Sequence, residues 1–199
     1  MIKKLSTYLF LLLFSFQTPS LADDIRDFQI EGMSVGDSAL DYFSKEKINN
    51  AKKGTYPSSD KFYNVTIFDN TSGISFSIFE SVKFHFKKND KNYTIVSISG
   101  KITYPDNFQD CRKEQKKTVN EIKDAFSLNS PKTYTDNFGG KGGKSIAYIS
   151  DFIISGDSIR VWCTKWDKKN KYTKNWIDGL NVAVETKEIL DWLTNESNK

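Results

Sequence analysis

Hydrophobic residues recur with two different periods along this chain, and the clearest period of three to four falls in the segment 108–126. That spacing places apolar side chains, among them Cys111 and Ile122, on one face of an α-helix. Basic residues of the same segment fall on the other faces. Asp106 or Asn107 can cap the first turn with a side-chain oxygen. The pattern predicts an amphipathic helix with one buried face.

A period of two, typical of β-strands with one buried face, prevails elsewhere. It predicts strands in the segments 61–68, 74–78, 82–86, 93–104, 146–154, 158–166 and 180–184. A change of phase near 79–81 predicts a bulge or a short break. The segment 129–144 contains Pro131 and four glycines, which predicts a loop.

Two further helices are predicted toward the two ends of the chain. The first begins within Met33–Phe43, where Ser34 can cap it, and ends near Asn49 and Asn50. The last spans Thr186–Leu193. The order of elements is therefore helix, strands, helix, strands, helix. This order predicts an α+β fold with helices packed on an antiparallel β-sheet.

The segment 1–22 has the pattern of a secretory signal peptide. A charged start is followed by an apolar run at Leu5–Phe16 and by Ser-Leu-Ala ending at Ala22. The apolar run is shorter than the roughly 20 residues that a membrane-spanning helix needs. We therefore expect cleavage after Ala22, a periplasmic or secreted location, and no membrane span after cleavage.

Residues 23–199 are expected to form one α+β domain. The repeated order of a helix followed by strands leaves open a division into two helix-plus-meander units, 33–104 and 106–195. The two segments show no residue-level repeat convincing enough to establish that division.

The charge balance excludes one class of partner. The chain carries 29 basic and 25 acidic side chains, a net charge of +4, and loss of Lys3 and Lys4 with the signal segment lowers it to +2. That value is too small for general electrostatic capture of nucleic acid. Nucleic acid is also scarce outside the cytoplasm, so we expect no nucleic-acid partner.

Cys111 and Cys163 are the two cysteines of the chain. An even number of cysteines in an exported protein favours a disulfide. Cys111 lies on the apolar face of its predicted helix, and Cys163 shares a strand face with Ile159 and Val161. Because both thiols should point into the core, the sequence predicts a structural Cys111–Cys163 disulfide.

Catalytic groups are few. His85, the single histidine, alternates with Lys83 and Lys87 and is expected to face solvent. A Gly-x-Ser-x-Gly elbow is absent, and the Gly-Lys-Ser sequence ending at Ser145 has Phe138 where a phosphate loop requires glycine. We therefore predict no catalytic, metal-binding or cofactor-binding residues and no cofactor. A hydrolase that uses carboxylates alone is the least favoured alternative.

One surface with binding potential follows from the strand periodicity. Arg160, Trp162 and Trp166 share one face of a predicted strand, and Tyr172 and Trp176 follow in a lysine-rich segment. Aromatic rings beside cations stack on sugars or anchor protein partners. The alternative is that the tryptophans cover a second small core.

The segment Gly-Met-Ser-Val-Gly-Asp at 32–37 resembles the opening of SmpA/OmlA-type outer-membrane assembly lipoproteins and of the related β-lactamase-inhibitor-like fold. The resemblance implies helices against an antiparallel sheet and a function in binding other proteins. The longer segment 32–43 is also similar to a family of exported proteins of AT-rich marine bacteria that has no assigned activity.

Export, one disulfide and few catalytic groups together favour a non-enzymatic protein-binding module whose partner is an unknown envelope protein or glycan. A carbohydrate or small-ligand binding protein that uses Trp162, Trp166, Tyr172 and Trp176 is the alternative. Joint exposure of Trp166 and Trp176 would favour binding, whereas burial of all four tryptophans would indicate a scaffold.

Overall fold

A computed structural model describes residues 24–56, 59–71, 73–138, 144–168, 171 and 176–196. The predicted signal segment 1–22, the glycine run 139–143 and Tyr172 lie outside the described residues. Within the described ranges, no helix is long and apolar enough to cross a membrane.

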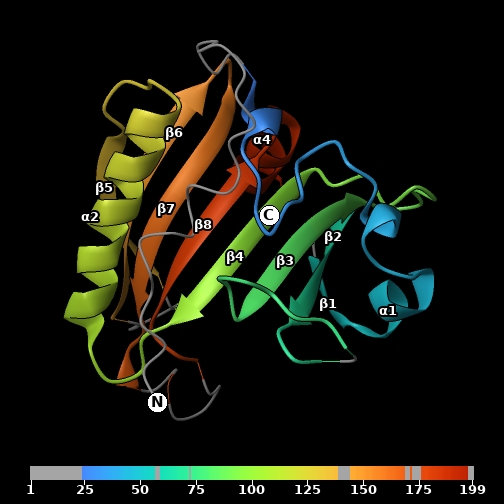
Figure 1. The fold of residues 1–199 in the computed structure, drawn as a ribbon, viewed down its shortest axis with the longest axis horizontal. Coiled ribbons are helices and arrows are strands. Elements are labelled where there is room, and N and C mark those ends of the chain that lie inside the picture. The colour runs from blue at the N-terminus through green and yellow to red at the C-terminus, as the bar shows by residue number, and fades with distance from the viewer. Residues whose placement is uncertain are drawn as a thin grey trace.

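The dominant element is one antiparallel sheet of eight strands in the order β1-β2-β3-β4-β8-β7-β6-β5 (Figure 1). The strands are β1 Lys52–Tyr56, β2 Ser59–Phe68, β3 Ser81–Lys87, β4 Ser97–Thr103, β5 Lys132–Phe138, β6 Ser145–Ile154, β7 Asp157–Lys165 and β8 Gly179–Glu185. The described helices are α1 Lys45–Asn50, α2 Phe108–Ala125 and α4 Lys187–Asn195, with the 3-10 turns η2 Ile25–Asp27 and η3 Ala39–Asp41. The fold is therefore α+β, with the sheet as its larger part.

Two four-stranded meanders, β1–β4 and β5–β8, meet in the middle of this sheet. Their last strands pair antiparallel along Ser97–Thr103 and Gly179–Glu185. Both predicted sets of strands thus belong to one sheet with continuous hydrogen bonding. The division into the units 33–104 and 106–195 stays a prediction.

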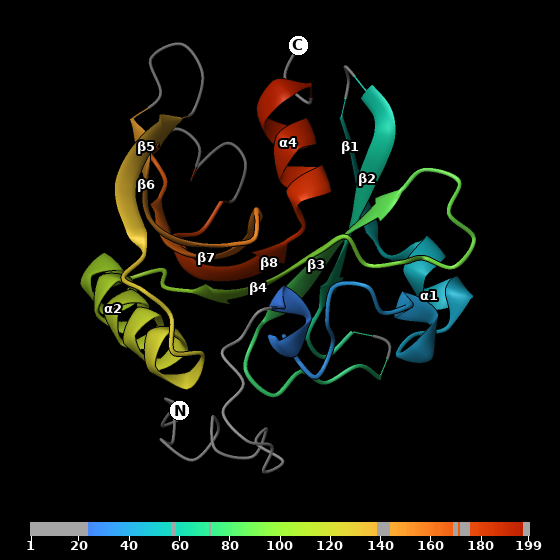
Figure 2. The ribbon, with the colours of Figure 1, turned by 90° about the horizontal axis from the view of Figure 1, so that it is seen from above.

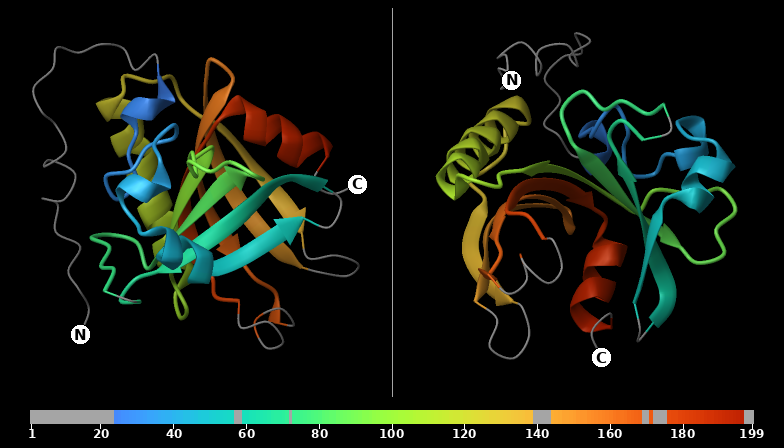
Figure 3. Two further views of the ribbon diagram at one scale, coloured as in Figure 1. Left: turned by 90° about the vertical axis from the view of Figure 1, so that its right-hand side faces the viewer. Right: turned by 90° about the horizontal axis from the view of Figure 1, so that it is seen from below.

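The sheet is strongly curved, and its two faces are covered differently (Figure 2; Figure 3). Helices α1 and α2 and the N-terminal turns lie against the convex face, whereas α4 lies inside the curve. The main core is on the convex side and includes Phe84, Val161 and Val182 from the strands. A smaller core under α4 contains Phe62, Val96, Ile189 and Trp192. Much of the concave face is therefore left to polar side chains.

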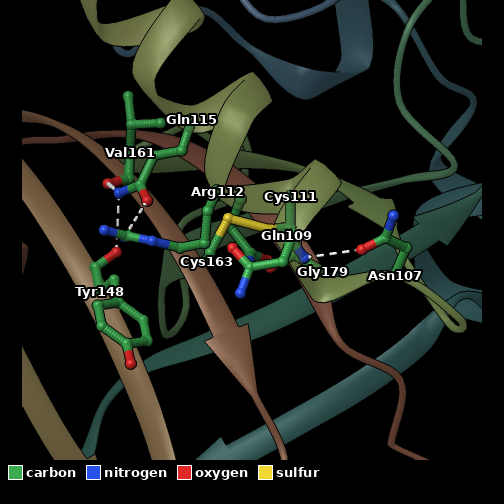
Figure 4. Close-up of a disulfide and its surroundings, with 10 residues drawn as sticks. Asn107, Gln109, Cys111, Arg112, Gln115, Tyr148, Val161, Cys163 and Gly179 are labelled. Atoms are coloured by element: carbon green, nitrogen blue, oxygen red, sulfur yellow. Dashed lines mark hydrogen bonds between the residues drawn. A yellow bond between two sulfur atoms is a disulfide. The ribbon is translucent and has the colours of Figure 1, made fainter.

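Helix α2 is attached to the sheet by polar contacts as well as by its apolar face. Asn107 caps the helix by accepting a hydrogen bond from the Gln109 amide at 3.0 Å. The buried Gln115 side chain donates to the backbone oxygens of Tyr148, at 2.8 Å, and Val161, at 2.9 Å (Figure 4). The predicted helix is confirmed. The Gln115 amide links it directly to the backbones of β6 and β7.

A disulfide between Cys111 of α2 and Cys163 of β7 adds a covalent link at the same place (Figure 4). The two Sγ atoms are 2.04 Å apart, and both residues are fully buried. The predicted pairing is confirmed. The bond closes a sequence separation of 52 residues, which restricts the unfolded chain.

Replacing both cysteines with alanine should lower the free energy of unfolding by about 4 kcal/mol, because loss of the link restores the conformational entropy of a long loop. Urea unfolding followed by circular dichroism measures the change. Wild-type protein treated with a reductant under native conditions is the control, and it should unfold at the same urea concentration as the double variant. Equal stability of the oxidised protein and the variant would contradict a stabilising role.

The predicted helix at 33–43 is wrong in its first part. Gly36 has φ +94°, outside the helical region, and its amide donates to the Ile95 oxygen at 2.8 Å. The Ile95 amide in turn donates to the Asp37 oxygen at 2.9 Å, and the Ala39 amide donates to Tyr93. These long-range hydrogen bonds replace helical ones, so only η3 and the short α1 remain of the predicted helix.

Two edge strands were not predicted, and one predicted strand is absent. Strands β1 and β5 form the two edges of the sheet, where a strand has one neighbour and needs less apolar alternation.

The segment 74–78 is irregular, in spite of its alternation. Its end is held by the Glu31 carboxylate, which accepts from the amides of Ser77, Ile78 and Phe79 at 2.7, 2.7 and 2.9 Å.

Glu31→Gln should lower the free energy of unfolding by about 2 kcal/mol, because hydrogen bonds to a charged acceptor are stronger than those to a neutral amide. Glu196→Gln, at an exposed position, serves as the control with the same chemical change. Thermal or urea unfolding of both variants provides the comparison. Equal stability of the two variants would show that Glu31 does not hold the 77–79 segment.

Candidate functional site

The strands of the sheet present alternate residues to the concave face, and most of these residues are polar. On β3, Val82, Phe84 and Phe86 belong to the main core, so Lys83, His85 and Lys87 point the other way. The same alternation turns two serines and one lysine of β4, and two polar residues of β8, to this face. They are Ser97, Ser99, Lys101, Asn181 and Glu185.

Three lysines, Lys52, Lys83 and Lys101, converge on this face, and we call them the lysine patch. Lys52 and Lys83 are both registered against Thr66 of β2, which places their Cα atoms about 10 Å apart. Lys83 is opposite Ser99, so Lys101 is its diagonal neighbour on β4, with Cα atoms about 7–8 Å apart. In the sheet, Thr66 separates Lys52 from Lys83.

None of the three lysines forms an ion pair with a residue that the structure describes. Lys101 donates to the backbone oxygen of Ile177 at 3.2 Å. By contrast, Lys87 on the same strand as Lys83 pairs with Glu188 of α4 at 2.7 Å. The lysine patch thus has no carboxylate at ion-pair distance in the described part of the chain, although the charge of Glu185 acts on Lys83 and those of Glu80 and Asp178 act on Lys101 from farther away.

The pKa values of two of these lysines reflect their crowding. Partial burial lowers the pKa of Lys83 below its usual value, and the charge of Lys52 lowers it further, while Glu185 opposes the shift. Burial also lowers the pKa of Lys101, followed by repulsion from Lys83. Lys83 and Lys52 nevertheless remain exposed to solvent. Solvent contact leaves their ammonium groups accessible to an anion.

His85 is buried rather than exposed, so the prediction that it faces solvent is wrong. Its exposed fraction is 7%, and its Nε2 atom lies 2.7 Å from the hydroxyl of Tyr56. Trp192 of α4 packs edge-on against Tyr56, with ring centroids 4.6 Å apart, and closes this end of the concave face. Burial and then the charge of Lys83 lower the pKa of His85 to about 3. His85 is therefore neutral at pH 7.

Arg160, one of the predicted interaction residues, lies on the concave face but is occupied by internal ion pairs. Its Nη2 atom is 2.9 Å from Asp151 and its Nη1 atom 3.1 Å from Glu185. Asp151 also accepts a hydrogen bond from Ser158. Burial raises the pKa of Glu185, while Arg160 acts against that shift. The guanidinium therefore has a structural role and does not add to the lysine patch.

The tryptophans divide between core and surface. Trp192 is buried under α4, and Trp162 and Trp166 are half-buried. Trp166 and Trp176 lie with ring centroids 4.3 Å apart, and Trp176 is 38% exposed. Tyr172, the remaining predicted residue, lies outside the described residues. The four tryptophans are therefore not all buried, and the joint exposure of Trp166 and Trp176 that would favour binding is met by Trp176 alone.

A pocket of about 420 Å³ adjoins the lysine patch at the edge of the sheet where β1 begins. Lys52, Thr66 and Phe68 contribute to its wall, together with residues of α1. The pocket extends the accessible surface beside Lys52 beyond the sheet itself. Among the described residues, no group of three or more His, Cys, Asp or Glu side chains is placed to hold a metal ion.

The lysine patch was missed in the sequence. Strand alternation already separates Lys83 and Lys101 from the core residues of β3 and β4. Their convergence with Lys52, however, depends on the register of four strands, and β1 itself was not predicted. Register between distant strands leaves no local signal in a single sequence.

No family model, curated protein or solved structure matches this chain. The resemblance of the segment 32–37 to SmpA/OmlA-type proteins accordingly stays a prediction.

His85→Asn should reduce the loss of stability in acid. The folded protein keeps His85 neutral down to about pH 3, whereas the unfolded chain binds a proton below about pH 6.5. The stability that this difference provides is present above pH 6.5 and is lost as the pH falls toward 3. At pH 4.5 the wild type should have lost about 2–3 kcal/mol more than the variant, relative to pH 7.5.

Urea unfolding at a series of pH values measures how the free energy of unfolding of each protein changes with pH. The contributions of the carboxylates are common to both proteins and cancel in the difference. If His85→Asn does not fold, His85→Gln offers the same test with a longer amide. Parallel pH profiles for wild type and variant would contradict burial of a neutral imidazole.

Proposed function

We propose that this chain is an exported, non-enzymatic binding module, and that its concave face binds a partner or ligand that carries negative charge. The observation that supports this proposal best is the lysine patch, whose three ammonium groups have no carboxylate partner among the described residues. Gathering like charges on one surface costs free energy. An anion bound there would offset that cost.

Other features support a binding role without catalysis. Both cysteines are joined in a disulfide, which removes them as nucleophiles. The one imidazole is buried against Tyr56. The disulfide is also compatible with an oxidising compartment, in line with the signal segment predicted at 1–22. On this proposal the protein acts in the periplasm or outside the cell, and its partner is an envelope protein or glycan with acidic groups.

Replacing Lys52 and Lys83 together with glutamine should weaken binding of a polyanion by about tenfold or more, because each charge-assisted contact contributes 1.5–3 kcal/mol. Poly-L-glutamate and oligogalacturonate are suitable probes, titrated by calorimetry at low salt. The matched control is Lys113→Gln with Lys116→Gln, which removes the same charge from an exposed part of α2 on the convex side.

At least one probe should bind the wild type, with an affinity that falls as salt is added. The control variant should bind that probe like the wild type. Equal losses in both double variants would indicate attraction by net charge alone, and the absence of binding to both probes would refute the proposed function.

A further inference from the structure

We propose that the ligand of the concave face is an acidic oligosaccharide, with a sugar carboxylate held by Lys83 and Lys101 and a sugar ring placed against Trp162. This inference rests on the proposed anion-binding function and specifies the chemical class of its ligand. It is carried by a row of side chains that crosses three adjacent strands, from Lys101 through Asn181 to Trp162.

The register of the sheet defines this row. Lys101 of β4 is opposite Asn181 of β8, and Asn181 is opposite Trp162 of β7. Because neighbouring strands are about 4.8 Å apart, the Cα atoms of Lys101 and Trp162 are about 10 Å apart. Side chains on backbone positions this far apart, a lysine, an asparagine and a tryptophan, suit the carboxylate, hydroxyl groups and ring face of a short acidic sugar chain.

The conformation of Lys101 is set by its neighbour Gly179. A Cβ atom at Gly179 would lie 2.8 Å from Cε of Lys101 and 2.7 Å from the backbone oxygen of Ile102. The absence of a side chain there lets Lys101 extend across β8, where its Nζ atom reaches the oxygen of Ile177. The Lys101 ammonium group is thereby held above β8, one strand nearer to Trp162 than its own Cα atom, and on the Ile177 side of the row.

Helix α4 leaves this row uncovered. The helix packs on Phe62 and Val96 and pairs with Lys87 at one end of the concave face. The row of Lys101 lies several residues farther along the strands, beyond the row of His85 and Ser97. Trp162 remains half-buried rather than buried. A ligand can therefore reach both ends of the row without displacement of α4.

The chemistry of this surface favours a sugar over an acidic peptide. Strands β4 and β8 each have a hydrogen-bonded neighbour on both sides, so they offer no free edge to a peptide strand. Recognition must then use side chains, namely lysine ammonium, serine hydroxyl, asparagine amide and indole. Such a set matches a polyhydroxylated anion. A small inorganic anion would use the lysines but would leave Trp162 without a role.

The test compares four probes by calorimetry on the full-length mature protein: trigalacturonate, the neutral galactose trimer, poly-L-glutamate and inorganic phosphate. Trigalacturonate should bind more tightly than the other three. Lys101→Gln should weaken its binding about tenfold, and Trp162→Leu about fivefold, while Trp162→Leu leaves the weaker binding of poly-L-glutamate unchanged. Lys113→Gln, on α2, is the control for charge.

The outcomes separate the two proposals. If poly-L-glutamate binds as tightly as trigalacturonate and Trp162→Leu affects neither, the anion-binding function stands, the sugar is excluded and an acidic protein is the partner. Phosphate binding equal to that of trigalacturonate would likewise exclude the sugar. If the neutral trimer binds best, or no anion binds, both proposals fail. If Trp162→Leu does not fold, Trp162→Phe replaces it and should retain most of the trigalacturonate affinity. Unchanged affinity in Trp162→Phe together with unchanged affinity in Lys101→Gln would overturn the inference.

Discussion

The antiparallel pairing of β4 with β8 is the contact on which the rest of this structure depends. It joins the two meanders into one sheet, because no other strands of the two sets are neighbours. The continuous sheet supports one main core on its convex side, with residues from both meanders. The same pairing aligns Lys101, Asn181 and Trp162 across the concave face. Stability and the candidate binding surface thus have a common origin in one ladder of hydrogen bonds.

Strand β3 illustrates how a short segment serves both faces. Its apolar residues enter the core, and its three polar residues on the other face have three different fates. Lys87 is neutralised by Glu188, His85 is buried against Tyr56, and Lys83 has no partner among the described residues. The fates differ because α4 and the end of β1 cover only one end of the strand. The candidate site therefore lies on the part of the concave face that α4 and the end of β1 do not cover.

Local patterns were sufficient to predict some of this structure. Helix α2 has a regular period and a cap, and the Cys111–Cys163 disulfide follows from the faces of two well-patterned elements. The irregular segment at 36–39 was mistaken for α-helix because its hydrogen-bond partners lie near residue 95, far along the chain. The burial of His85 was missed for a similar reason, since Tyr56 and Trp192 cover it from outside its strand. What could not be predicted depends on contacts between distant segments.

The Glu31 contact has a consequence for the order in which the chain assembles. Glu31 can engage only after residues 77–79 exist as a chain, and the segment at 36–39 must wait for residues 93–95. The first part of the domain therefore has no stable partner of its own while it is being synthesised. Structure at the N-terminus is acquired late, as contacts of long sequence separation form.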